Sequence, residues 1–184
     1  MTRSIALTTL LLLAACGSAP VRYDLPPEIA TVQIPVSYGA IEVREVTLPR
    51  YASEENIYFE DASGGLVSNP GLLWADDPTR SFTEGLAFSL AAQTRARVAA
   101  EPWPFSDFPD ARVDVRFSRA LAGNDGYYRI AGQYFVAPVE GARADVARRF
   151  AIAEPYDALD LPSIAAAKGR AIGDLAALIA RDGL

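Results

Sequence analysis

The sequence predicts an α+β domain in which two helices pack on one face of a mostly antiparallel sheet. Three observations lead to this class. Stretches in which apolar and polar residues alternate, as in half-buried strands, lie on both sides of a stretch with helical spacing. Three of the alternating stretches follow one another directly, as in an antiparallel meander. A second stretch with helical spacing closes the chain.

Four strands are expected in the first part of the chain, at residues 21–25, 41–48, 56–60 and 66–74. The first is short and suits a sheet edge. The second alternates apolar and charged residues and then shifts phase, which predicts a β-bulge before Pro49 ends it. The last two flank the Gly64-Gly65 turn, so we expect them to pair as a hairpin.

The first helix is expected to begin at Asp77-Pro78, because aspartate caps free backbone N–H groups and proline fits the first helical position. A slightly later start, at the capping box of residues 81–84, is the alternative. One face of the helix is marked by residues that recur every four positions, namely Phe82, Leu86, Leu90, Thr94 and Val98. Pro102 is expected to end the helix. Trp74, just before the helix, is expected to be buried between strand and helix.

Residues 101–110 (EPWPFSDFPD) place three aromatic side chains, Trp103, Phe105 and Phe108, between prolines in a loop. Aromatic residues in such a position usually fill the gap between a helix end and a sheet, which is one interpretation. The other is that part of this apolar surface stays open and binds a partner, because aromatic residues dominate interface hot spots and prolines lower the ordering cost. The second interpretation makes these three residues a partner-binding site.

Three further strands are expected at residues 112–120, 127–136 and 143–153. The turn at residues 123–126 (GNDG) joins the first two as a hairpin. The second helix is expected to begin at Asp160. Its buried face is predicted to hold Leu161, Ile164, Ala165, Ile172, Leu175 and Ile179.

The composition excludes most catalytic machinery. The 184 residues contain no histidine and one cysteine, so a Ser-His-Asp triad, a Cys-His nucleophile and the usual zinc sites cannot be built. Asp76 and Asp77 are the candidate for acid–base chemistry, but Asp-Asp-Pro is also what a helix start requires. We therefore expect no enzyme, no cofactor and no metal. A net charge of −6 also makes nucleic acid an unfavourable partner.

The first 15 residues have the pattern of a secretory signal peptide, with Arg3 followed by an apolar run that is too short to span a bilayer. Residues 13–16 (LAAC) resemble the lipobox of bacterial lipoproteins. The resemblance implies that Cys16 is acylated and becomes the first residue of the mature protein, whereas the alternative is an ordinary cleavage site beside a free thiol. Because Gly17 is not the aspartate associated with inner-membrane retention, the resemblance implies the periplasmic face of the outer membrane.

These features predict three parts of the chain: a signal peptide at 1–15, an acylated cysteine with an extended tether at 16–39, and a single α+β domain at 40–184. The second part is rich in proline and lacks periodicity, which is typical of a tether.

The chain also resembles the ABC-type transport auxiliary lipoproteins of the PqiC/YmbA kind. The resemblance rests on the lipobox and on four stretches, RYDL at 22–25, VTLPRY at 46–51, LWADDP at 73–78 and VDVRF at 113–117. It implies a non-catalytic, lipid-anchored component that docks an MCE-domain tunnel protein or its ABC transporter and helps phospholipid to move between membranes. It also implies a homo-oligomeric ring as the form in which such a component works. A structural or pilot lipoprotein of another outer-membrane complex is the alternative, and a lipid-modifying enzyme is a distant third.

Overall fold

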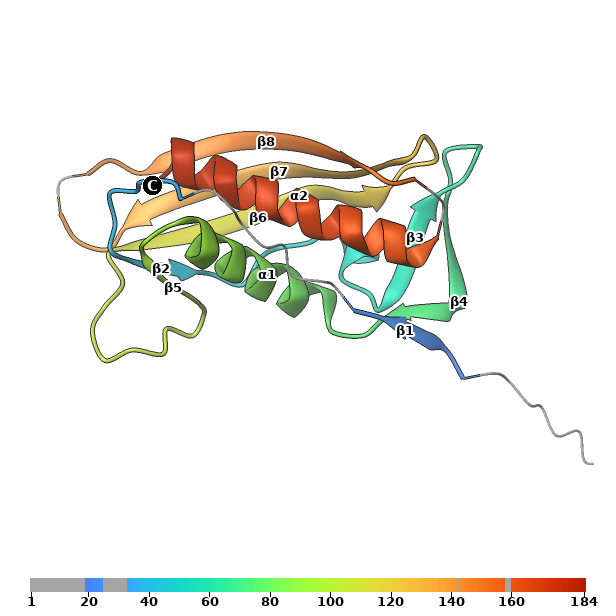
Figure 1. Ribbon diagram of the computed structural model, residues 1–184, viewed down its shortest axis with the longest axis horizontal. Helices are drawn as coiled ribbons and strands as arrows, with labels where there is room; N and C mark the ends of the chain where they lie inside the picture. Colours follow the sequence, from blue (N-terminus) through green and yellow to red (C-terminus); the bar gives the residue numbers. More distant parts are fainter. Residues whose placement is uncertain (1–18, 25–32, 142, 158–159) are drawn as a thin grey trace, which may run out of the picture.

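The computed structural model describes residues 19–24, 33–141, 143–157 and 160–184. The elements, in chain order, are β1 (Val21–Tyr23), β2 (Ala40–Val43), a 3₁₀ turn η1 (Arg50–Ala52), β3 (Asn56–Glu60), β4 (Leu66–Trp74), α1 (Pro78–Gln93), β5 (Arg97–Ala100), β6 (Ala111–Ala122), β7 (Tyr127–Pro138), β8 (Val146–Pro155) and α2 (Leu161–Asp182). Both helices lie across one face of the sheet (Figure 1). The predicted α+β class is confirmed. The predicted signal peptide lies outside the described residues.

The described strands form one mixed sheet of eight strands. The longest ladders, β6 with β7 and β7 with β8, are antiparallel, as is the β3–β4 hairpin, in agreement with the predicted meander and hairpin. The short strands pair in parallel: β1 with β4, β2 with β5 and β6, and β3 with β6. The connection between β2 and β5 contains α1, and such a crossover returns the chain in the same direction, so these two strands pair in parallel.

Strand β6 organises the two ends of the molecule. One of its edges pairs with β7 along its whole length. Its other edge pairs with β2 at Ala111–Val113 and with β3 only at Ala122. About 36 Å separate the first and last residues of a twelve-residue strand. The β2–β5 pair and the β3–β4–β1 group therefore lie at opposite ends of the molecule (Figure 1).

Each helix begins at the predicted cap. The Asp77 carboxylate accepts a hydrogen bond from the backbone N–H of Arg80 at 2.9 Å, and the Asp160 carboxylate accepts one from Ser163 at 2.8 Å. The helices bury apolar stripes against the sheet, with Phe82, Leu86 and Leu90 from α1 and Leu161, Ile164, Ala165, Ile172, Leu175 and Ile179 from α2. The predicted buried face of α2 is confirmed.

Two elements are shorter in the structure than predicted, the first helix and the strand predicted at 41–48. α1 ends at Gln93, because Thr94 is extended and its hydroxyl bonds back to the Leu90 carbonyl at 2.7 Å. Val98, which the four-residue spacing placed on the helix, instead lies in β5 and pairs with Ile41 of β2. Pairing with a buried neighbouring strand outweighs the local spacing here.

The strand predicted at 41–48 pairs regularly only as far as Val43. The interruption falls at the predicted phase shift. There the backbone N–H of Val46 turns away from β6 and donates to the Thr83 hydroxyl of α1 at 3.1 Å. Thr47 then rejoins β6 in a single bridge to Arg116.

Trp74 is buried, as predicted, and its ring contacts the buried amine of Lys168. Lys168 of α2 is the only lysine in the chain, and it is 1% exposed. Its Nζ lies 4.1 Å from the centroid of the Trp74 ring and 4.5 Å from that of Phe82. Burial lowers the pKa of Lys168 to about 7, although the negative charge of Asp76 acts in the opposite direction.

We expect Lys168 to titrate near pH 7 in the folded protein and near 10.5 in the unfolded chain. Between these values the unfolded chain binds more protons, so the free energy of unfolding should rise as the pH increases from 7 to 10.5. Because the chain has one lysine, ¹³C labelling of lysine gives a single side-chain signal, and its NMR titration measures the pKa directly. Lys168→Met should remove this part of the pH dependence. A signal that titrates near 10.5 in the folded protein would contradict the burial of the amine.

Trp74→Ala is expected to lower the free energy of unfolding by about 3–5 kcal/mol, because it leaves a cavity between β4 and the two helices. Chemical denaturation measures this loss. The matched control is Trp103→Ala, which removes an indole that is not part of the core cluster and should cost much less. Equal costs for the two substitutions would contradict the core position of Trp74.

Candidate functional site

The loop at residues 101–110, which we call the aromatic loop, joins β5 to β6 at the end of the molecule that holds β2 and β5 (Figure 1). A carboxylate of β2 fixes where it begins. Glu42 is buried, and its Oε1 accepts the backbone N–H of Trp103 at 3.2 Å while its Oε2 accepts the Arg112 guanidinium at 2.7 Å. The end of the loop is fixed by Asp110, whose carboxylate accepts the N–H groups of residues 39 and 40 at 2.8 and 2.9 Å.

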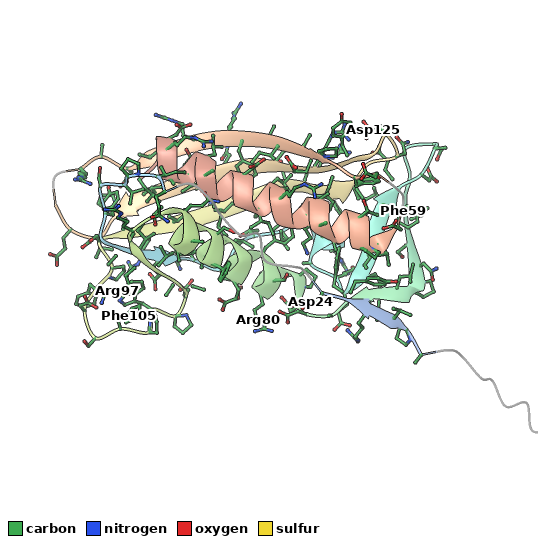
Figure 2. The ribbon with its side chains drawn as sticks, in the orientation of Figure 1. Asp24, Phe59, Arg80, Arg97, Phe105 and Asp125 are labelled. Carbon is green, nitrogen blue, oxygen red and sulfur yellow. The ribbon has the colours of Figure 1, made fainter. Side chains whose placement is uncertain are left out.

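Contacts within the loop and with β5 hold the aromatic rings. The Arg97 guanidinium lies over the rings of Phe105 and Trp103, at 4.5 and 5.6 Å from their centroids (Figure 2). The two rings meet edge to face at 4.9 Å. Arg97 also pairs with Asp107, and this hydrogen bond lowers the pKa of the Asp107 carboxyl. The Trp103 indole N–H donates to the Asp107 carbonyl at 2.6 Å. The loop is therefore ordered by its own contacts before any partner is present.

The aromatic loop keeps much of its apolar surface in solvent. Phe108 is 76% exposed, Phe105 is 41% exposed, and Trp103 is half-buried. The interpretation that these rings fill a gap in the core is therefore wrong for the two phenylalanines. The physical reason is that Phe105 packs on Arg97 and Trp103, within the loop and its supporting strand. Partner binding by the three residues stays a prediction.

An extended segment at residues 33–39, which we call the strap, runs beside the same end. Ile34, Val36 and Tyr38 pack partly against the core. The N–H of Ile34 donates to the Gln93 carbonyl at 2.7 Å, and that of Ser37 donates to the Leu184 carbonyl at 2.8 Å. The strap thus joins the C-terminal ends of both helices.

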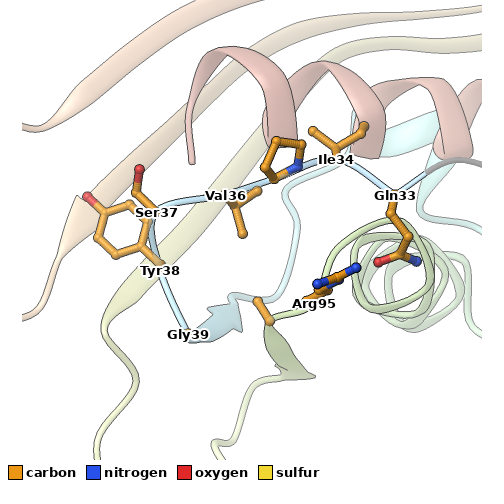
Figure 3. A pocket seen from close by; sticks show the side chains of 9 residues that line it. Gln33, Ile34, Val36, Ser37, Tyr38, Gly39 and Arg95 are labelled. Atoms are coloured by element: carbon orange, nitrogen blue, oxygen red, sulfur yellow. The ribbon is translucent and has the colours of Figure 1, made fainter.

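Two clefts flank the strap. One, of about 580 Å³, is lined by the strap, Arg95 and Ala96 (Figure 3). The other, of about 520 Å³, lies between Tyr38, Phe108 and Arg143, and the guanidinium of Arg143 stacks over the Tyr38 ring at 4.8 Å. The first cleft lies beside the C-terminal ends of both helices, which carry a partial negative charge. This charge stabilises the Arg95 cation. It also disfavours an anionic ligand in the cleft.

The carboxylates considered for chemistry have structural partners. Asp77 caps α1, and Asp76 forms an ion pair with Arg80 at 2.7 Å. Across the described ranges, no three side chains of the metal-binding types gather in one place. Cys16, the predicted lipidation site, lies outside the described residues.

Sequence reasoning missed Arg97 and Glu42 as parts of the aromatic site. Arg97 falls within the helix that the sequence predicts from Asp77 to Pro102, whereas the structure places it in β5 beneath the loop. Only the parallel register of β5 with β2 brings both side chains to the loop. The β-branched Thr94, four residues after Leu90, is the one local signal for an earlier helix end.

Comparisons with known proteins establish the family. The model of the ABC-type transport auxiliary lipoprotein component family matches residues 23–180. No curated protein matches the chain. None of the described helices is long and apolar enough to cross a membrane.

Solved structures support the fold. A crystal structure of an uncharacterized protein is 16% identical, with a TM-score of 0.71 over 89% of this chain and 97% of that one. Protein XCC0632 from Xanthomonas campestris is 17% identical, with a TM-score of 0.68 over 86% of this chain and 92% of that one. At these identities the likeness establishes the fold alone. Because the family model covers most of the sequence, the chain belongs to the ABC-type transport auxiliary lipoprotein components.

Proposed function

We propose that the protein is a non-catalytic auxiliary component of an MCE-type lipid transport system, anchored through Cys16 to the periplasmic face of the outer membrane. In this role it docks an MCE-domain tunnel protein or the ABC transporter subunits, supports phospholipid transport and so contributes to outer-membrane integrity. A homo-oligomeric ring is part of the proposal. Family membership supports the association with an ABC-type transport system. The lipobox supports the anchor.

The observation that carries the proposal is the exposed, ordered aromatic loop. Large apolar side chains that stand in solvent on a rigid support are typical of interaction sites. Arg97, Asp107 and Glu42 hold the loop in place, so a partner does not have to order it, and binding loses less conformational entropy. The exposed rings supply the apolar area that interface hot spots use.

Changing Phe105 and Phe108 together to serine is expected to leave the melting temperature nearly unchanged, because both rings are exposed. The same change should abolish co-purification with the MCE-domain partner and raise the detergent sensitivity of the cells. Phe88→Ser, which removes another exposed phenylalanine from α1, is the matched control and should keep the partner. A sharp fall in melting temperature would show that the two rings belong to the core. Unchanged capture of the partner would show that the loop does not bind it.

Cys16→Ser is expected to release the protein into the soluble periplasm or to leave it as an uncleaved precursor, because serine cannot form the thioether of a lipobox. Fractionation of cells follows the release, and mass spectrometry of the native N-terminus tests the acylation directly. An unmodified residue 16 in the wild-type protein would contradict the anchor.

A further inference from the structure

Strand β1 is built into the domain although it lies only a few residues after the predicted anchor. Val21–Tyr23 pair in parallel with Leu72–Trp74. Arg22 donates to the Trp74 carbonyl at 3.0 Å and pairs with Glu55 at 3.1 Å. The Tyr23 carbonyl accepts the backbone N–H of Ala75 at 2.8 Å. The strand is therefore held by backbone, charge and side-chain contacts together.

The covalent chain limits how far this strand can lie from the anchor. An extended chain gains at most about 3.6 Å per residue, so the five steps from Cys16 to Val21 reach about 18 Å at most. This is half of the roughly 36 Å that β6 spans between the two ends of the molecule. The group β3–β4–β1 holds the strand at one end, and the aromatic loop lies at the other (Figure 2, Phe59 against Phe105).

We infer that the protein stands on the membrane with its β1–β4 end against the lipid surface and presents the aromatic loop away from it. The inference rests on the anchor of the proposed function and adds an orientation and a membrane contact to it. In this inference residues 17–20 set the distance of the domain from the membrane. They are a shorter connection than the tether expected at 16–39. Two of the exposed large apolar side chains lie at the β1–β4 end, Val21 at 52% and Leu66 at 43% exposure.

Charge provides no attraction that would hold the broad sheet face on an anionic membrane. With a net charge of −6, the chain is repelled by an anionic lipid surface. The arginines on the sheet face away from the helices do not reverse this, because carboxylates pair with them, as Arg112–Glu42, Arg116–Asp114, Arg119–Glu60 and Arg129–Asp125. Among the described residues, Arg149 is the arginine of this face without an ion pair.

Energy transfer from single labels to the bilayer tests the orientation. Cys16 is the only cysteine and carries no free thiol when acylated, so Asn69→Cys in β4 and Ser106→Cys in the aromatic loop each accept one donor dye. The full acylated protein is inserted in vesicles of phosphatidylethanolamine and phosphatidylglycerol that contain an acceptor-labelled headgroup. Transfer from position 69 should be at least twofold more efficient than from position 106. Equal transfer, which means that the molecule lies flat, or stronger transfer from position 106 would overturn the inference.

Two insertions of equal length locate the end of the connection. Ten Gly/Ser residues between Ser18 and Ala19 add a flexible chain of about 18 Å, so transfer from position 69 should fall at least twofold. The same ten residues between Glu28 and Ile29, after β1, should leave it unchanged. If both insertions lower the transfer equally, the domain is tethered beyond β1 and the inference is wrong.

The N-terminal mass spectrum separates this inference from the proposed function. If residue 16 carries no lipid, the anchor fails and the orientation fails with it. If residue 16 is acylated and the two labels report equal transfer, the orientation alone fails and the anchored transport component stands. Loss of partner capture in the Phe105 and Phe108 double variant is independent of both measurements.

Discussion

Strand β6 is paired along the whole of one edge and at both ends of the other, and the positions of most other elements follow from this constraint. Its alternation sends Val113, Val115 and Phe117 into the core beneath the helices. Its first residues hold β2, which in turn holds β5, and its last residue meets β3. Because the aromatic loop leads into one end of β6 and β1 belongs to the group at the other, the candidate partner site and the first strand of the domain lie at opposite ends of β6.

Local patterns were sufficient for the elements whose partners are near in sequence. The GNDG turn and the alternation on either side of it predict the β6–β7 pairing. Asp77 and Asp160 mark the two helix starts, because an N-cap depends only on the next few residues. The parallel pairings, and the strand β5 that depends on one of them, could not be found in this way. β5 looks like the last turn of a helix until Ile41 is placed beside Val98, and that contact joins residues 57 positions apart.

The same distinction applies to the candidate site. Its composition is visible in the sequence, since Trp103, Phe105 and Phe108 stand between prolines. Their exposure is not visible in the sequence, because it depends on whether the rings pack in the core or against a neighbouring charged side chain. Arg97 and Glu42 decide this, and they reach the loop only through the register of two short strands. Similarly, no local pattern indicates that Lys168 is enclosed by Trp74 and Phe82.

The burial of Lys168 has a practical consequence for the study of this protein. Every other cationic side chain of the chain is an arginine, so the folded surface offers no primary amine apart from the amino terminus. Amine-directed cross-linkers and fluorophores will therefore leave the domain unmarked, and its absence from an amine cross-linked complex is no evidence against contact. Reagents that join carboxylates, which the acidic surface supplies in number, are the suitable choice for trapping its neighbours.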